Sequence, residues 1–117
     1  HKCMGDTNYF SGIVKILENP VQSFINNKTL TTTFQAEIPQ IRENKIVSLV
    51  FWGNLAQEVK NYYQVSDYIL IEGYVSIKIN NTNLLDKNSK KVIITVLKVS
   101  PFLLKSNIQA RKNSNNS

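Results

Sequence analysis

Apolar and polar residues alternate with a changing period through the middle of the chain, from residue 45 to residue 79. Five of the eight residues 45–52 are β-branched or aromatic, which is typical of a strand, and their parity divides them between two faces. One face is uniformly large and apolar, so we assign to the core Val47, Leu49 and Phe51. The other face ends in Trp52, whose indole has less need of burial.

The period then becomes that of a short helix. Asn54 is a suitable N-cap, and Gln57 stands three residues later, where a capping-box partner reaches back. One helical face is formed by Leu55, Ala56, Val59, Tyr62 and Tyr63. A turn at residues 66–67 leads into a second alternating strand, with apolar positions Ile69, Ile71, Val75, Ile77 and Ile79. Gly73 falls on the apolar parity and predicts a bend or bulge.

The N-terminal part of the chain predicts two strands with a connector between them. Residues 8–17 form a strand interrupted by Gly12, and residues 21–30 form a connector in which Phe24 is a buried plug. Residues 30–38 alternate, with inward Leu30, Thr32, Phe34, Ala36 and Ile38 and outward Thr31, Thr33, Gln35 and Glu37. Residues 39–44 form a short loop.

The C-terminal part predicts one more strand. Residues 80–89 form a polar loop, and residues 90–102 form the last strand, which ends at Pro101. Its apolar parity switches at Val96–Leu97, which predicts a bulge. We expect a domain over residues 8–104, a flexible start over 1–7 and a disordered basic, polar tail over 105–117. Five strands, with one helix between the third and fourth, predict an all-β OB-fold barrel.

A known family matches the central segment. The run Val-Phe-Trp-Gly-Asn-Leu-Ala-Gln, followed by Val-Lys-Asn-Tyr-Tyr-Gln-Val-Ser-Asp-Tyr-Ile-Leu-Ile-Glu-Gly, resembles the signature of the bacterial and organellar single-stranded-DNA-binding (SSB) proteins. More narrowly, it is similar to small SSB-like proteins encoded in algal plastid genomes, and the resemblance covers roughly residues 8–102. It implies that Trp52 occupies the position of a base-stacking aromatic residue.

The chain also departs from the family pattern. Ile46 and Asn80 stand where the family places further aromatic residues, and Ser48 stands where it often has Arg. The outward positions of residues 31–37 carry no cation, and Arg111-Lys112 stand in place of an acidic tail. Because of these differences, it remains open whether the chain has kept the SSB fold but lost or narrowed the DNA binding.

Charge favours an anionic partner, and the sequence offers little for catalysis. The net charge is +6, and residues 81–117 contain seven Lys or Arg against Asp86 alone. This basic field suits a nucleic acid, although a solvated loop and tail would look the same. His1 and Cys3 have no catalytic or metal-binding companions, so we expect no enzyme, metal or cofactor. No apolar run is long enough to span a membrane.

Single-strand binding requires cations along a groove and aromatic faces for bases. The candidate residues are Trp52, Lys45, Tyr74, Lys78, Lys87, Lys90, Lys91 and Lys98. We expect Tyr74 and Lys78 to lie near the point where Trp52 emerges. The alternatives are that Trp52 plugs the end of the barrel against the helix and that Tyr74 is a subunit contact.

Two functions remain open from the sequence. In the first, the protein is an SSB-like module that binds single-stranded nucleic acid, DNA in particular, as a homodimer or homotetramer. In the second, it is a non-catalytic interaction subunit of a larger plastid assembly, with an apolar patch of Ile46, Val50, Leu70 and Tyr74. The resemblance and the Asn-, Lys- and Ile-rich composition place either protein in the plastid stroma.

Overall fold

Six strands and one helix make up the computed structural model, which describes residues 8–39, 43–80 and 89–105. The elements are β1 (Asn8–Ile16), β2 (Val21–Ile25), β3 (Thr29–Ile38), β4 (Lys45–Trp52), α1 (Gly53–Tyr62), β5 (Tyr68–Asn80) and β6 (Ser89–Leu103). The predictions for residues 1–7 and 106–117 and for Lys87 lie outside the described residues.

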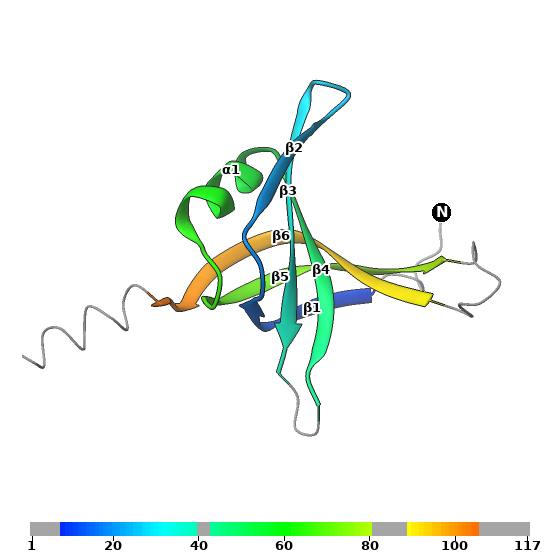
Figure 1. Cartoon of the computed structure of the whole chain (residues 1–117), viewed down its shortest axis with the longest axis vertical. Helices are drawn as coiled ribbons and strands as arrows, with labels where there is room; N and C mark the ends of the chain where they lie inside the picture. Colours follow the sequence, from blue (N-terminus) through cyan, green and yellow to red (C-terminus); the bar gives the residue numbers. More distant parts are fainter. Residues whose placement is uncertain (1–7, 40–42, 81–88, 106–117) are drawn as a thin grey trace, which may run out of the picture.

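The strands form one sheet that closes on itself (Figure 1). Their order is β1-β5-β6-β4-β3-β2, and a further pairing of β1 with β3 closes the barrel. All neighbours are antiparallel except β4 and β6, which run parallel. The OB-fold prediction is confirmed, but there are six strands rather than five, so the helix follows the fourth.

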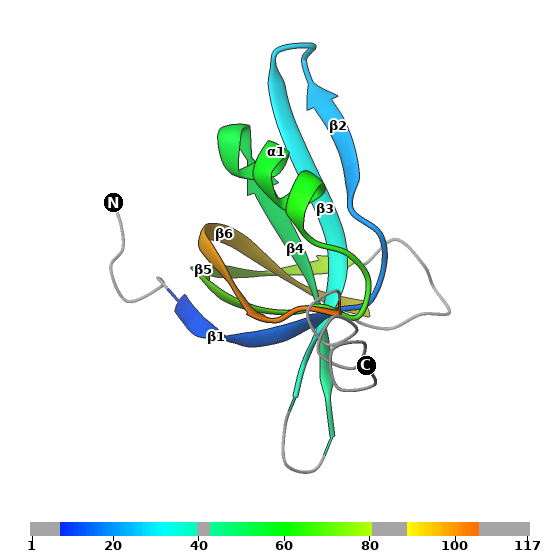
Figure 2. The same cartoon turned by 90° about the vertical axis from the view of Figure 1, so that its left-hand side faces the viewer.

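The additional strand is β2, which we had expected to be a connector with Phe24 buried. The turn explains the extra strand, because Asn26 and Asn27 both adopt a positive φ, which Asn tolerates, and the Lys28 N–H donates to the Ile25 carbonyl at 3.1 Å. β2 therefore pairs back on β3. The hairpin projects from the barrel (Figures 1 and 2), so the side chain of Phe24 is 64% exposed and the prediction of a plug is wrong.

The core follows the predicted parity. Val47, Leu49 and Phe51 are buried, and the rings of Phe51 and Phe34 stack with centroids 5.3 Å apart. The inward face of β3 is confirmed at Thr32, Phe34 and Ala36. On the outward parity Thr31 is also buried, against prediction. On β5, Ile77 and Ile79 have the core parity but are exposed, because the β5–β6 hairpin runs beyond the barrel (Figure 1).

Gly73 lies where β5 and β6 approach most closely. Glu72 pairs with Lys98 but Gly73 pairs with Val96, so Leu97 is an extra residue that forms the predicted bulge. A Cβ at Gly73 would collide with the backbone carbonyl of Thr95, which is why only glycine fits. β6 does not end at Pro101, as predicted, because a second register shift carries its pairing on to Leu103.

Helix α1 covers one end of the barrel beside β3 and β4 (Figure 2). It begins at Gly53, one residue before the predicted cap, so the Asn54–Gln57 capping box is wrong and Trp52 occupies the N-cap position without a side-chain hydrogen bond. Thr32 fixes the helix by donating its hydroxyl to the Ala56 carbonyl at 2.7 Å. Of the predicted apolar face, Ala56, Val59 and Tyr63 are buried, Leu55 is partly buried, and Tyr62 is 71% exposed.

The predicted turn at residues 66–67 also joins the helix to the end of β6. The buried carboxylate of Asp67 accepts hydrogen bonds from the backbone N–H groups of Gln64, at 2.9 Å, and Lys105, at 2.8 Å. Asp67 therefore ties together two segments that are far apart in the sequence. In the described part of the chain, the single helix is too short and too polar to cross a membrane.

Candidate nucleic-acid interface

Trp52 lies at the junction of β4 and α1. Its backbone is extended, and the positive φ of Gly53 then turns the chain into the helix. The indole has the outward parity and is 42% exposed. Trp52 pairs with Thr31 of β3, whose hydroxyl lies 3.1 Å from that of Ser23 on β2. Trp52 is thus an exposed aromatic residue on a hydrogen-bonded support rather than a plug of the barrel end.

The outward side chains of β3, β4, β6 and β5 form one continuous surface, which we call the outer face. Val50 is level with Thr95 of β6, which is level with Tyr74 of β5. We had expected Tyr74 close to Trp52, but β6 lies between β4 and β5. Tyr74 is therefore two strand spacings, about 10 Å, across the sheet from Val50, and the predicted proximity is wrong.

Tyr74 has an aromatic neighbour that the sequence analysis missed. Tyr9 of β1 pairs with it, and the two rings meet edge to face with centroids 5.6 Å apart. The Tyr9 hydroxyl donates to Glu72 Oε1 at 2.7 Å, and this bond to the carboxylate raises the pKa of Tyr9. Both rings are about half exposed. Only the pairing of β1 with β5 reveals this cluster, because Tyr9 carries no local signal.

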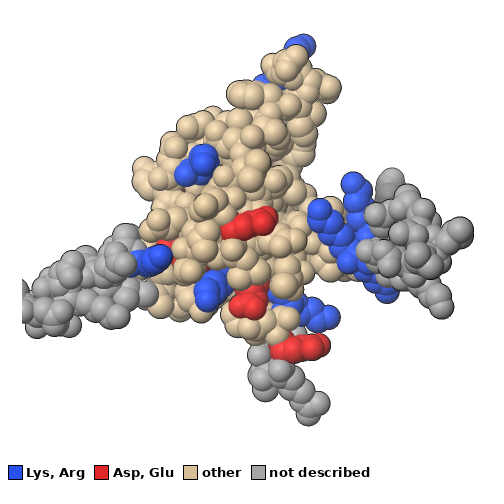
Figure 3. Space-filling model, viewed as in Figure 1, with Lys and Arg blue, Asp and Glu red and all other residues tan. Residues whose placement is uncertain are grey.

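The lysines gather at the opposite end of the outer face. Lys78 pairs with Lys91, and Lys90 pairs with Ile79, near the far end of the β5–β6 hairpin, where Figure 3 shows basic side chains gathered. Lys78 and Lys91 share the outward parity of Trp52. Lys45 begins β4 on the core parity, opposite Ile38, and is exposed because the strand extends beyond the core.

The separation of the two ends follows from the register. Lys91 is level with Ile46, since Ser48 pairs with Ile93 in the parallel ladder. Six residues separate Ile46 from Trp52, which corresponds to about 20 Å along the strand. We call Trp52 the aromatic end of the outer face and Lys78 with Lys91 its basic end.

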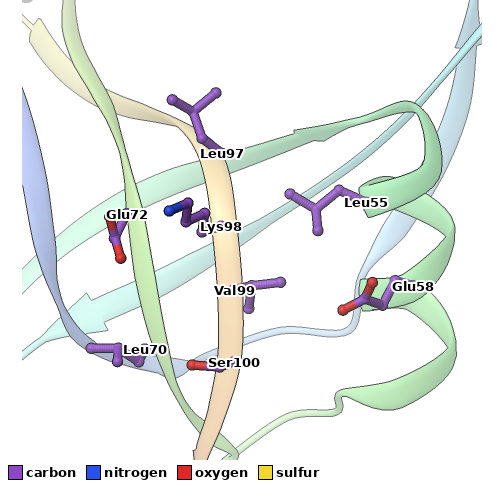
Figure 4. Close-up of a pocket in the computed structure, with 8 residues that line it drawn as sticks. All are labelled: Leu55, Glu58, Leu70, Glu72, Leu97, Lys98, Val99 and Ser100. Atoms are coloured by element: carbon purple, nitrogen blue, oxygen red, sulfur yellow. The ribbon is translucent and has the colours of Figure 1, made fainter.

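Lys98 lies elsewhere, in a groove between α1 and the β5–β6 pair. This groove is also lined by Leu55, Leu70 and two carboxylates, Glu58 and Glu72 (Figure 4). Lys98 pairs directly with Glu72 across the two strands. Because two carboxylates line the same groove, Lys98 belongs to the basic surface less than Lys78 and Lys91 do.

A metal site is not evident in the described residues. Within residues 8–39, 43–80 and 89–105, no three side chains of His, Cys, Asp or Glu are grouped so as to hold a metal ion.

Comparison with known proteins decides the family. One curated relative, named "Putative single-stranded DNA-binding protein ycf41", from Trieres chinensis, is 39% identical over 105 residues. The match spans 85% of this chain and 92% of the relative. The chain belongs to the ycf41 family. The predicted resemblance to SSB-like proteins is thereby confirmed.

Solved structures share the fold at much lower identity. The SSB domain of a Synechococcus protein has a TM-score of 0.64 and 23% identity, covering 85% of this chain and 97% of that domain. The mitochondrial single-stranded DNA binding protein Rim1 from S. cerevisiae has a TM-score of 0.70 and 6% identity, covering 85% and 98%. No protein-family model matches the ycf41-like chain.

Proposed function

We propose that this protein binds single-stranded DNA along the outer face, with bases on Trp52 and phosphates on Lys78 and Lys91. The observation that carries the proposal is the exposed indole of Trp52 on the same face as the two lysines. Aromatic stacking contributes roughly 1–3 kcal/mol per base and tolerates any sequence, because every base has a π-face. The names of the ycf41 relative and of the structural neighbours support this function.

The other predicted binding residues should contribute to DNA binding to different extents. Tyr74 offers a second aromatic surface across the sheet, 47% exposed. Lys45 and Lys90 have the core parity and are exposed, so they add positive charge beside the basic end from the other side of the sheet, and Lys87 follows β5 in the sequence. Lys98 contributes least, because its groove is also lined by Glu58 and Glu72. The protein acts by binding and carries out no catalytic step.

Assembly and location form the second part of the proposal. We place the protein in the plastid stroma as a homodimer or homotetramer, supported by the ycf41 relative and by the SSB-like fold. The alternative of an interaction subunit that has lost DNA binding is not favoured by the relatives. Light scattering of the purified chain measures the assembly directly, and a monomer at all concentrations would contradict this part.

Fluorescence of the single tryptophan tests DNA binding. We expect oligo-dT to quench Trp52 saturably, and we expect the affinity to fall steeply with salt because bound phosphates release counterions. A folded protein whose fluorescence is unchanged by oligo-dT at low salt, and which does not shift a labelled oligonucleotide, would rule the proposal out. An affinity that does not change with salt would show that the lysines do not bind phosphates.

A further inference from the structure

A shallow depression lies on the outer face between its aromatic and basic ends. Its volume is about 220 Å³, and the side chains that matter to its chemistry are Glu18, Gln35, Ser48, Val50, Lys91 and Ile93. Val50 stands two residues before Trp52 on β4, and Lys91 stands two residues before Ile93 on β6. A strand that stacks on Trp52 and reaches the lysines therefore passes over this depression.

The hollow exists because a small residue occupies its centre. Ser48 pairs with Gln35 on one side and with Ile93 on the other, so larger side chains surround a single hydroxymethyl group. Val50 and Ile93 are half-buried and provide apolar surface, which suits the face of a base. The rim carries opposite charges, with the Glu18 carboxylate toward β3 and the Lys91 ammonium on β6.

Glu18 is unexpected on a surface that meets phosphates, because a carboxylate repels them. One of its oxygens has a structural partner: Oε1 accepts the backbone N–H of Gln35 at 2.8 Å. A carboxylate has two oxygens, so Glu18 retains acceptor capacity beyond this bond. A carboxylate accepts well from an exocyclic amino group, such as N4 of cytosine, whereas thymine presents a carbonyl oxygen at the equivalent position.

We propose that this depression receives a base with an exocyclic amino group, so that the protein prefers cytosine to thymine, with Glu18 as the residue that discriminates. Val50 and Ile93 contact the face of the base. Glu18 accepts from its amino group, and Lys91 donates to a ring nitrogen or carbonyl oxygen or to the adjacent phosphate. This inference rests on the proposed DNA binding and adds a base preference to it.

The test compares labelled oligo-dC and oligo-dT of equal length by fluorescence anisotropy. Homopolymers differ in stacking and flexibility, so the readout is the change in the dC/dT affinity ratio between variants. We expect the wild-type protein to favour oligo-dC by about fivefold or more. Glu18→Gln keeps an oxygen for the Gln35 N–H but replaces the second acceptor with an NH₂ donor, so the ratio should fall to about one or below.

Two further variants separate the base contact from general charge and from folding. Glu37→Gln removes the same charge from β3 outside the depression and should leave the ratio unchanged. Ser48→Leu fills the hollow and should abolish the preference while oligonucleotides still quench Trp52. Thermal unfolding establishes that each variant is folded.

The outcomes are distinct. If Glu18→Gln and wild type bind with the same dC/dT ratio, Glu18 only caps the Gln35 N–H and the inference is overturned, while the proposed DNA binding stands. If neither oligonucleotide binds the folded wild-type protein, the proposed function itself fails and the base preference fails with it.

Discussion

The aromatic and basic ends of the outer face are built in different ways. Trp52 stands on a supported site: Phe51 before it is fully buried, Thr31 opposite it is buried and hydrogen-bonded, and Gly53 after it starts the helix. Lys78 and Lys91 stand on a hairpin that runs beyond the core, where even Ile77 and Ile79 are exposed. One end is therefore held by packing, and the other acts mainly through charge.

This difference indicates that the free energy of DNA binding has two parts, one from stacking at the aromatic end and one from charge at the basic end. A supported ring presents a stacking surface at little entropic cost, and stacking depends weakly on salt. Exposed lysines supply an electrostatic attraction that salt screens and that tolerates side-chain motion. The two ends should thus respond to different perturbations, and four variants, each with its measurement, probe this difference and the fold that supports it.

The largest effect on stability and binding is expected from a substitution of Gly73, because both ends of the outer face rely on the barrel that its close packing permits. Gly73→Ala should destabilise the fold by about 3 kcal/mol, because the added Cβ meets backbone that cannot move aside, and DNA binding should fall at both ends together. Gly12→Ala is the matched control, since the atoms nearest its Cβ belong to the movable ring of Phe10, and it should cost about 1 kcal/mol. Urea unfolding measures both. Equal stability of the two variants would contradict the β5–β6 register.

Removing the aromatic end should weaken binding without changing its electrostatics. Trp52→Ala should lower the affinity for a labelled oligo-dT roughly 5- to 150-fold, while the slope of log affinity against log salt stays the same. Tyr62→Ala removes a more exposed ring, which lies on α1 away from the outer face, and should have no effect. A changed salt slope for Trp52→Ala would show that the two ends are not separable.

Removing the basic end should change the salt dependence of binding and leave the stacking on Trp52 intact. In the double variant Lys78→Gln, Lys91→Gln the salt slope should decrease by about 1.4, because each phosphate contact on a single strand contributes about 0.7. Quenching of Trp52 at saturation should be retained. Lys60→Gln, on α1, removes a cation from outside the outer face and should leave the slope unchanged. An unaltered slope in the double variant would place the phosphates elsewhere.

The smallest effect is expected at the Tyr9–Glu72 bond, which lies beside the path between the two ends. The raised pKa of Tyr9 means that the bond contributes its full stability below the unfolded pKa of about 10, and that this contribution is lost as pH rises through the folded value. Tyr9→Phe should remove this pH dependence and leave DNA affinity unchanged near neutral pH. Melting temperatures of both proteins from pH 8 to 11 test it; identical pH profiles would show that the bond does not contribute.

Local sequence patterns were enough to find five of the six strands, the core face of the central strands and the family. Alternation placed Val47, Leu49 and Phe51 in the core, and the parity switch at Val96–Leu97 located the bulge before any pairing was known. These features are local, because each strand buries one side of its own pleat. The exposure of Trp52 also follows from parity, since it falls on the opposite face of the same strand.

Which side chains are neighbours across the sheet depends on the three-dimensional arrangement of the strands. β6 inserts between β4 and β5, which separates Tyr74 from Trp52, pairs Lys98 with Glu72 and opens the depression around Ser48. Tyr9 likewise joins Tyr74 through the pairing of β1 with β5. A strand's own residues specify which face is buried, but pairing between distant strands depends on how the whole barrel closes, and no local period encodes that choice.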